Sequence, residues 1–180
     1  MSAWAHRYIR DGFEVVCLRP GSMCPQSARG VHSATRSHDV VTKLWSETPT
    51  ANIGLRVPVG HVLLQVDTTQ GGSVWHLKKL GATMSSKTAA NTWEFLYKAP
   101  GLRLCPGNKE GSIRMQGRNA ILVAEPSTLK SGGRYQWFDL RRPVAPPLSY
   151  FAELGLAVDL PECGPALKDH LHADAGSPMA

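Results

Sequence analysis

An apolar run over residues 62–67 constrains the fold more than any other feature of this sequence. The run consists of Val and Leu except at two positions, Gln65 and Asp67, and it is typical of a β-strand. Residues two apart on a strand point to the same face, so both polar side chains are expected at one spot. The pair Gly71-Gly72 then breaks the segment. The sequence therefore predicts a largely buried strand that presents two polar groups near its end.

These two polar positions favour one kind of chemistry. Strands of this kind often deliver two aspartates to a metal ion, because Mg²⁺ and Mn²⁺ prefer anionic oxygen ligands. Here the first position is Gln65, which offers only a neutral oxygen. The residues alone thus indicate a metal-dependent phosphoryl-transfer site that has lost part of its ligand set.

The other expected elements mix helices and strands. Helices are predicted from helical spacing of apolar residues over 2–11, 37–47, 72–80 and 149–156. Further strands are predicted over 13–18, 52–57, 92–98, 112–116, 119–124 and 135–140. Two of them, 112–116 and 119–124, are expected to form a hairpin that turns at Gly117-Arg118. The mixture predicts an α+β fold in which helices cover a sheet.

The bulk properties are those of one domain. The chain has 180 residues, of which 1–157 are predicted to form the domain and 158–180, polar and poorly patterned, a flexible tail. No run approaches the roughly 20 apolar residues of a membrane span, and no signal-peptide pattern is visible. The spacing of the four cysteines matches no zinc module. We therefore expect a cytoplasmic protein with reduced thiols and no membrane partner.

The charge of the chain favours a polyanionic partner, but only weakly. The formal net charge is +6. Arg29 and Arg36 lie in a loop rich in Gly, Ser and Pro, and they are candidate contacts to a nucleic-acid backbone. Solvated loop charge is the alternative that we favour. Trp45 and Trp75 could stack bases, but their helical spacing predicts that they are core residues.

Several short motifs follow one another along the chain between about residues 3 and 150. They are Pro20-Gly21 with Pro25, Ala34-Thr35 with Asp39, Leu44-Trp45 with Pro49, Ala51-Asn52-Ile53-Gly54-Leu55, Asp67 with Gly71-Gly72, Pro126-Ser127, and Gly133 with Tyr135 and Trp137. Together they resemble the small primase-polymerase domain found in many plasmid, phage and actinobacterial replication proteins, a branch of the archaeo-eukaryotic primase superfamily. The resemblance implies a primase-polymerase-like core with a mainly antiparallel central sheet flanked by helices.

The resemblance also implies a set of site residues. In the family, an Asp-x-Asp pair and a third acid hold divalent metals that clamp the attacking and leaving oxygens of nucleotidyl transfer. The first acid falls on Gln65 and the second on Asp67. The family's phosphate-binding histidine falls on Glu94, and the third acid falls on Arg114. Only Asp67 matches the family's residue type.

The replaced positions predict impaired catalysis. A fixed cation about 4 Å from a divalent ion is repelled by roughly 8 kcal/mol at an effective dielectric constant near 20. Arg114 would therefore oppose metal binding, and Glu94 would repel a triphosphate. We expect no bound cofactor, or Mg²⁺ or Mn²⁺ if the protein is active. We also expect that Arg114 replaces the metal as the counter-charge of Asp67, with Glu94 near the same cluster.

Alternatives remain open for these residues and for the function. Asp67 is either a strand-end acid held by an ion pair, which we favour, or a remnant metal ligand. Glu94 is either a polar strand residue or a migrated ligand that forms a metal site with Asp67. The leading function is a divergent replication-linked domain that binds DNA, nucleotide or replication proteins. The alternatives are an active metal-dependent nucleotidyltransferase that uses Asp67, Glu94 and Gln65, and a regulatory protein that binds no nucleic acid.

Overall fold

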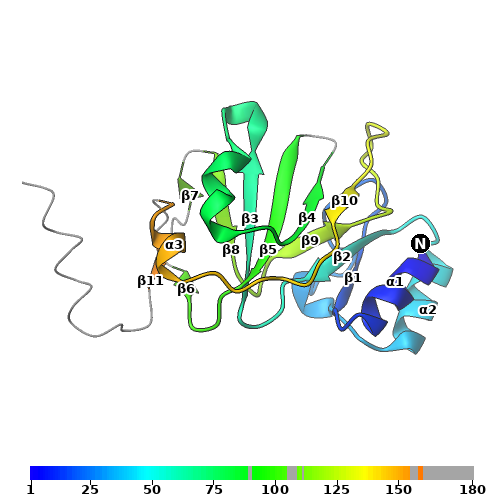
Figure 1. Cartoon of the computed structure of the whole chain (residues 1–180). Coiled ribbons are helices and arrows are strands. Elements are labelled where there is room, and N and C mark those ends of the chain that lie inside the picture. Colours follow the sequence, from blue (N-terminus) through cyan, green and yellow to red (C-terminus); the bar gives the residue numbers. More distant parts are fainter. Residues whose placement is uncertain (89–90, 105–108, 111, 155–157, 160–180) are drawn as a thin grey trace, which may run out of the picture.

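The computed structural model describes residues 1–180 except 89–90, 105–108, 111, 155–157 and 160–180. Figure 1 shows two N-terminal helices beside the smaller of the two main sheets, with the larger sheet in the middle of the molecule. These helices are α1 (Ser2–Arg10) and α2 (His38–Glu47). The side chain of Ser37 caps α2 by accepting a hydrogen bond from the backbone N–H of Val40, which explains where this helix begins.

The smaller sheet has three antiparallel strands in the order β1-β2-β9. These are β1 (Val15–Leu18), β2 (Asn52–Arg56) and β9 (Ile121–Ala124). Buried side chains from both helices, among them Tyr8 and Trp45, pack with Ile53 and Leu55 in one hydrophobic cluster. Burial of such apolar surface is the main force that holds α1 and α2 on this sheet.

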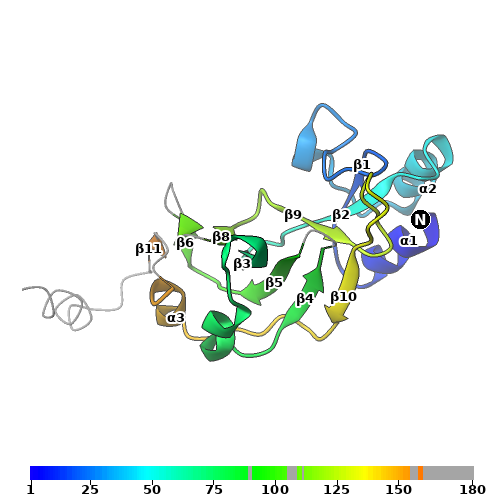
Figure 2. The same cartoon turned by 90° about the horizontal axis from the view of Figure 1, so that it is seen from above.

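The larger sheet has six strands in the order β10-β4-β5-β3-β8-β7, all of them paired antiparallel (Figure 2). They are β3 (His61–Asp67), β4 (Met84–Lys87), β5 (Thr92–Lys98), β7 (Lys109–Glu110), β8 (Ile113–Gln116) and β10 (Gln136–Asp139). Tyr97 and Phe151 belong to a second hydrophobic cluster, which joins this sheet to α3 (Ser149–Ala152). The central position of β3 explains its apolar sequence.

Five short elements complete the fold. Three are 3₁₀-helices, namely η1 (Gly30–Ser33), η2 (Thr68–Gln70) and η3 (Val74–Leu80). The other two are the paired strands β6 (Arg103–Leu104) and β11 (Val158–Asp159). The α+β class and the mainly antiparallel sheet that the sequence predicts are thereby confirmed.

The predicted hairpin over 112–124 is wrong. The expected turn forms, because the N–H of Ala120 donates to the carbonyl of Gly117. However, β8 pairs with β3 in the larger sheet, whereas β9 pairs with β2 in the smaller one. The turn therefore carries the chain from one sheet to the other. A local turn signal does not determine which strand a segment pairs with, since pairing depends on residues far away in the sequence.

The predicted helix over 72–80 is a 3₁₀-helix, and this changes which residues it buries. With three residues per turn, side chains three apart share a face. Leu77 and Leu80 form the buried face, and Trp75 falls outside it with 72% of its surface exposed. The interpretation of Trp75 as a core residue is therefore wrong, while Trp45 is buried as expected.

The predicted tail begins within the last described strand. Val158–Asp159 pairs with β6, and the rest of the predicted tail lies outside the described residues, so the domain boundary stays a prediction. In the part of the chain that the structure describes, no helix has both the length and the apolar character needed to cross a membrane.

Candidate active site

The strand register brings the four predicted site residues together. β3 lies between β5 and β8 (Figure 1). Gln65 is directly opposite Glu94 on β5 and Arg114 on β8, and Asp67 lies two residues further along β3. All four line one cavity of about 320 Å³, which we call the central cleft. Its other lining residues are Met23, Gln70, Thr88, Thr92, Ser112, Leu129 and Tyr135.

Glu94 is a buried carboxyl group whose partners are all neutral. Only 2% of its surface is exposed. One oxygen accepts a hydrogen bond from Nε2 of Gln65 at 2.8 Å, and the other accepts one from Oγ of Ser86 at 3.1 Å. Loss of solvation raises the pKa of Glu94 to about 7, although both hydrogen bonds favour the carboxylate and lower the pKa. Glu94 therefore changes its charge near neutral pH.

Gln65 uses both ends of its amide within the sheet. While its Nε2 donates to Glu94, its Oε1 accepts a hydrogen bond from Nε2 of Gln116 on β8. Gln116, Gln65, Glu94 and Ser86 thus form a continuous chain of hydrogen bonds across β8, β3, β5 and β4. We call this the polar chain. It satisfies Glu94 without a cation.

Arg114 lines the same cleft but is exposed to solvent. Among the ion pairs between described residues, none joins Arg114 to Glu94 within 4.0 Å. At Glu94 the donors are an amide and a hydroxyl, while the role of Arg114 as the counter-charge of Asp67 stays a prediction. Arg114 adds positive charge to the wall of the cleft rather than neutralising Glu94.

Asp67 ends β3 and starts the turn that follows it. Its Oδ1 accepts hydrogen bonds from the backbone N–H of Thr69 at 2.9 Å and from the hydroxyl of Thr69 at 2.6 Å. The chain then folds back, and the N–H of Gly72 donates to the carbonyl of Asp67. A Cβ at position 72 would lie 2.4 Å from that carbonyl oxygen, so only glycine fits. The Gly71-Gly72 pair thus shapes one end of the cleft.

The residues of the central cleft do not fit a two-metal site. Such a site needs several anionic oxygens that converge on the ions. Gln65 is neutral and its oxygen is already bonded, Glu94 is buried within the polar chain, and Arg114 is a cation. Among the described residues, no group of three or more His, Cys, Asp or Glu side chains is placed to hold a metal ion.

The structure places two other predicted residues away from the cleft and adds two that were not predicted as site residues. Arg29 and Arg36 are exposed and do not line the central cleft, and their contact with nucleic acid stays a prediction. Ser86 was missed because the Ser-Ser-Lys of β4 lacks a strand-like apolar pattern. Tyr135 is buried in the same cleft as Glu94, and burial, with a smaller contribution from the charge of Glu94, raises the pKa of Tyr135 to about 12.

The comparisons with known proteins bear on the family of this chain. A family model described as "Bifunctional DNA primase/polymerase, N-terminal" matches residues 5–148, which are 144 of the 180 residues. A search of curated proteins found no match. The matched region contains both main sheets and all four central residues of the cleft. The chain therefore belongs to the family of bifunctional DNA primase/polymerase N-terminal domains, which is linked to DNA replication.

Proposed function

We propose that this protein is a divergent primase-polymerase domain of the plasmid and phage replication type, impaired in nucleotidyl transfer. In this proposal it keeps the binding of nucleic acid, nucleotide or a replication partner. The observation that carries the proposal is the polar chain, which occupies the positions where the resemblance places a metal ligand and a phosphate-binding histidine. Neutral and buried groups have replaced the charges that the chemistry needs.

Three energetic costs oppose metal binding at this place. A metal ion would have to share or displace the hydrogen bonds on the oxygens of Gln65 and Glu94, at about 1 kcal/mol for each bond that is lost. Glu94 would also have to be ionised in a buried environment that favours its neutral form. Finally, the positive charge of Arg114 on the same wall repels a divalent cation. These costs add up against the weak ligand set.

One observation favours a second candidate, an active nucleotidyltransferase with a rearranged metal site. Asp67, Glu94 and Gln65 line the same cavity of about 320 Å³. That volume lies within the range of about 300–1,000 Å³ that is usual for small-molecule sites. In this candidate, Asp67 and Glu94 would bind Mg²⁺ or Mn²⁺ directly.

A nucleotide-incorporation assay separates the two candidates. With labelled nucleotides, a primer-template and either Mg²⁺ or Mn²⁺, we expect the protein to form no more product than its Asp67→Asn variant. The reason is that the remaining ligands hold too little negative charge to retain the metal. Product that disappears in Asp67→Asn would establish the active enzyme and overturn our proposal.

A variant that restores the family's residue types tests the same idea in the opposite direction. We expect Gln65→Asp/Glu94→His/Arg114→Asp to bind Mn²⁺ at least about tenfold more tightly than the unchanged protein, because it changes the charge of the site in favour of a cation. Calorimetric titration measures this affinity. Gln65→Asn/Glu94→Gln/Arg114→Gln serves as the control without added carboxylates. Equal Mn²⁺ affinity in both triple variants would show that these positions do not determine metal binding.

A further inference from the structure

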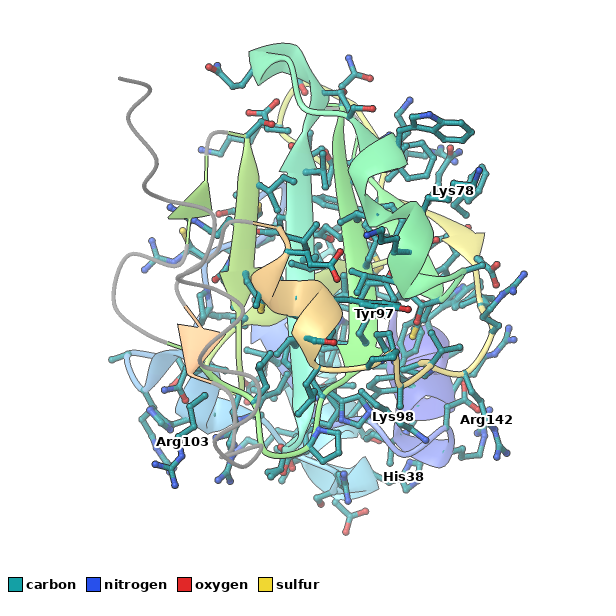
Figure 3. All side chains as sticks on the ribbon, turned by 60° about the vertical axis from the view of Figure 1, so that its left-hand side comes forward. His38, Lys78, Tyr97, Lys98, Arg103 and Arg142 are labelled. Atoms are coloured by element: carbon teal, nitrogen blue, oxygen red, sulfur yellow. The ribbon has the colours of Figure 1, made fainter. Side chains whose placement is uncertain are left out.

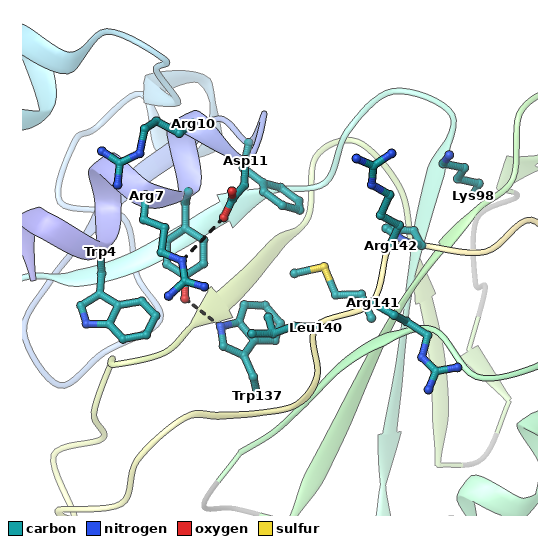
Figure 4. A pocket seen from close by; sticks show the side chains of 13 residues that line it. Trp4, Arg7, Arg10, Asp11, Lys98, Trp137, Leu140, Arg141 and Arg142 are labelled. Carbon is teal, nitrogen blue, oxygen red and sulfur yellow. Dashed lines mark hydrogen bonds and ion pairs between the residues drawn. The ribbon is translucent and has the colours of Figure 1, made fainter.

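A second cavity lies outside the central cleft, between α1 and the segment that follows β10. Its volume is about 570 Å³, and it shares no lining residue with the central cleft. We call it the basic cleft (Figure 4). Its lining residues are Trp4, Arg7, Tyr8, Arg10, Asp11, Phe13, Met84, Lys98, Trp137, Leu140, Arg141, Arg142 and Pro143.

The charge of the basic cleft is unbalanced. Five basic residues line it, and Asp11 is its one acid. Arg7 lies 3.9 Å from Asp11, and Arg141 is paired with Asp139 at 2.6 Å. For the other three cations, the described part of the chain offers no carboxylate within 4.0 Å. These three are Arg10, Lys98 and Arg142.

The three unpaired cations come from three separate segments. Arg10 lies in the last turn of α1, where a cation also stabilises the helix dipole. That explanation does not apply to Lys98, which ends β5, or to Arg142, which follows β10. The N–H of Lys98 donates to the carbonyl of Val144, which holds the two segments side by side. Figure 3 shows Lys98 and Arg142 toward the same end of the larger sheet. Three cations that line one cavity without a paired carboxylate favour an anionic ligand.

Aromatic side chains line the basic cleft, and hydrogen bonds fix two of them in position. The indole N–H of Trp137 donates to the hydroxyl of Tyr8 at 2.7 Å, and that hydroxyl donates to the carbonyl of Glu125 at 2.6 Å. Figure 4 shows Trp137 between the arginines of α1 and those that follow β10, with Trp4 on the side of α1. Trp4 and Trp137 are both partly exposed, and the guanidinium of Arg7 lies over the Trp4 ring, 5.3 Å from its centre.

We infer that the basic cleft binds a nucleotide unit, either free or within a single strand of nucleic acid. Its phosphates contact Arg10, Lys98 and Arg142, because guanidinium groups match phosphate oxygens in charge and geometry and the ammonium group of Lys98 attracts them as a point charge. Its base packs on the face of the Trp4 ring that Arg7 does not cover, a contact that tolerates any base. The cavity volume suits a ligand of this size. This inference deepens the binding part of the proposed function and is independent of any activity in the central cleft.

The test compares two double variants that lose the same charge. Arg10→Ala/Arg142→Ala removes two cations of the basic cleft, whereas Lys43→Ala/Arg134→Ala removes two exposed cations elsewhere. The probe is a fluorescein-labelled oligo-dT, measured by anisotropy at several salt concentrations. We expect the first variant to weaken binding at least about tenfold and to lower the salt slope by about 1.4, which is about 0.7 for each lost phosphate contact on a single strand. The control should change affinity less than about twofold.

Two further ligands, inorganic tripolyphosphate and a nucleoside triphosphate, show which part of a nucleotide the basic cleft binds. Trp4→Ala is expected to weaken the binding of the oligonucleotide about tenfold and that of inorganic tripolyphosphate hardly at all, because only the oligonucleotide has bases to stack. A nucleoside triphosphate that binds the unchanged protein when the oligonucleotide does not, and loses affinity in Arg10→Ala/Arg142→Ala, supports the cleft with a free nucleotide as its ligand. Thermal unfolding of each variant verifies that it is folded.

Three results would overturn the inference. Equal weakening by both double variants would show that only the overall charge matters. Binding that is lost in Arg114→Ala but kept in Arg10→Ala/Arg142→Ala would place the nucleic acid in the central cleft and leave the proposed function intact. If no phosphate-bearing probe binds the unchanged protein, the inference fails together with the nucleic-acid and nucleotide binding in the proposed function.

Discussion

Glu94→Gln is expected to raise the free energy of unfolding by about 3 kcal/mol at pH 8 and by only about 1 kcal/mol at pH 5. Folding raises the pKa of this buried carboxyl from its usual value of 4.5 to about 7. Between these values the folded state holds a proton that the unfolded chain has lost. The stability of the unchanged protein therefore falls as the pH rises from 4.5 to 7, and the full cost is present above pH 7.

Glutamine avoids this cost because it is neutral at every pH and has almost the same shape. Its oxygen can still accept a hydrogen bond from Gln65, and its amide N–H can donate to the hydroxyl of Ser86. Urea unfolding at pH 5 and pH 8 measures the difference. Glu47→Gln, on the exposed face of α2, is the matched control and should change stability by less than about 0.5 kcal/mol.

The outcome of this experiment also bears on the function. A protein whose central cleft binds cations would need Glu94 to be ionised, and its replacement by glutamine would remove a ligand. Destabilisation by Glu94→Gln at both pH values would show that the carboxylate has a cationic partner in the folded protein, contrary to the polar chain described above. Stabilisation at pH 8 would show that the ionised form is held at a cost.

Asn52→Asp is expected to lower the free energy of unfolding by about 4 kcal/mol at pH 8. Asn52 is fully buried at the start of β2. Its Nδ2 donates to the carbonyls of Ser22 and Thr128, at 3.0 and 2.7 Å, and its Oδ1 accepts from the N–H of Thr128. Aspartate keeps the accepted bond but loses both donated ones. It also places a negative oxygen against two carbonyl oxygens in a buried site.

The matched control is Asn119→Asp, the same change of charge at an exposed position in the turn between β8 and β9. It should alter stability by less than about 0.5 kcal/mol. Chemical denaturation of both variants at pH 8 gives the comparison. Equal effects of the two substitutions would mean that Asn52 does not join the loop at Ser22 to the segment at Thr128.

Asn52 also supports the central cleft, because Met23 and Leu129, the next residues in these two segments, line it.

Much of the central cleft was predictable because strand geometry is local. The two-residue alternation placed Gln65 and Asp67 on one face, and the family resemblance aligned Glu94 and Arg114 with them; the register confirms that Gln65 faces both. What each side chain does was less predictable. Arg114 was expected as the counter-charge of Asp67, which stays a prediction, whereas the neutral partners of Glu94, the amide of Gln65 and the hydroxyl of Ser86, were not foreseen. Ser86 lies on β4, a strand without an apolar pattern, so no sequence signal placed it there.

The sequence by itself determined the α+β class, most of the helices and strands, and the family, since these depend on local periodicity and on short motifs in a fixed order. Only the tertiary structure decided that β8 and β9 belong to different sheets, that Trp75 faces solvent and that Arg10, Lys98 and Arg142 line one cavity. It also decided the raised pKa of Glu94. The physical reason is that burial, charge balance and strand partners depend on groups distant along the chain, which become neighbours only when the chain is folded.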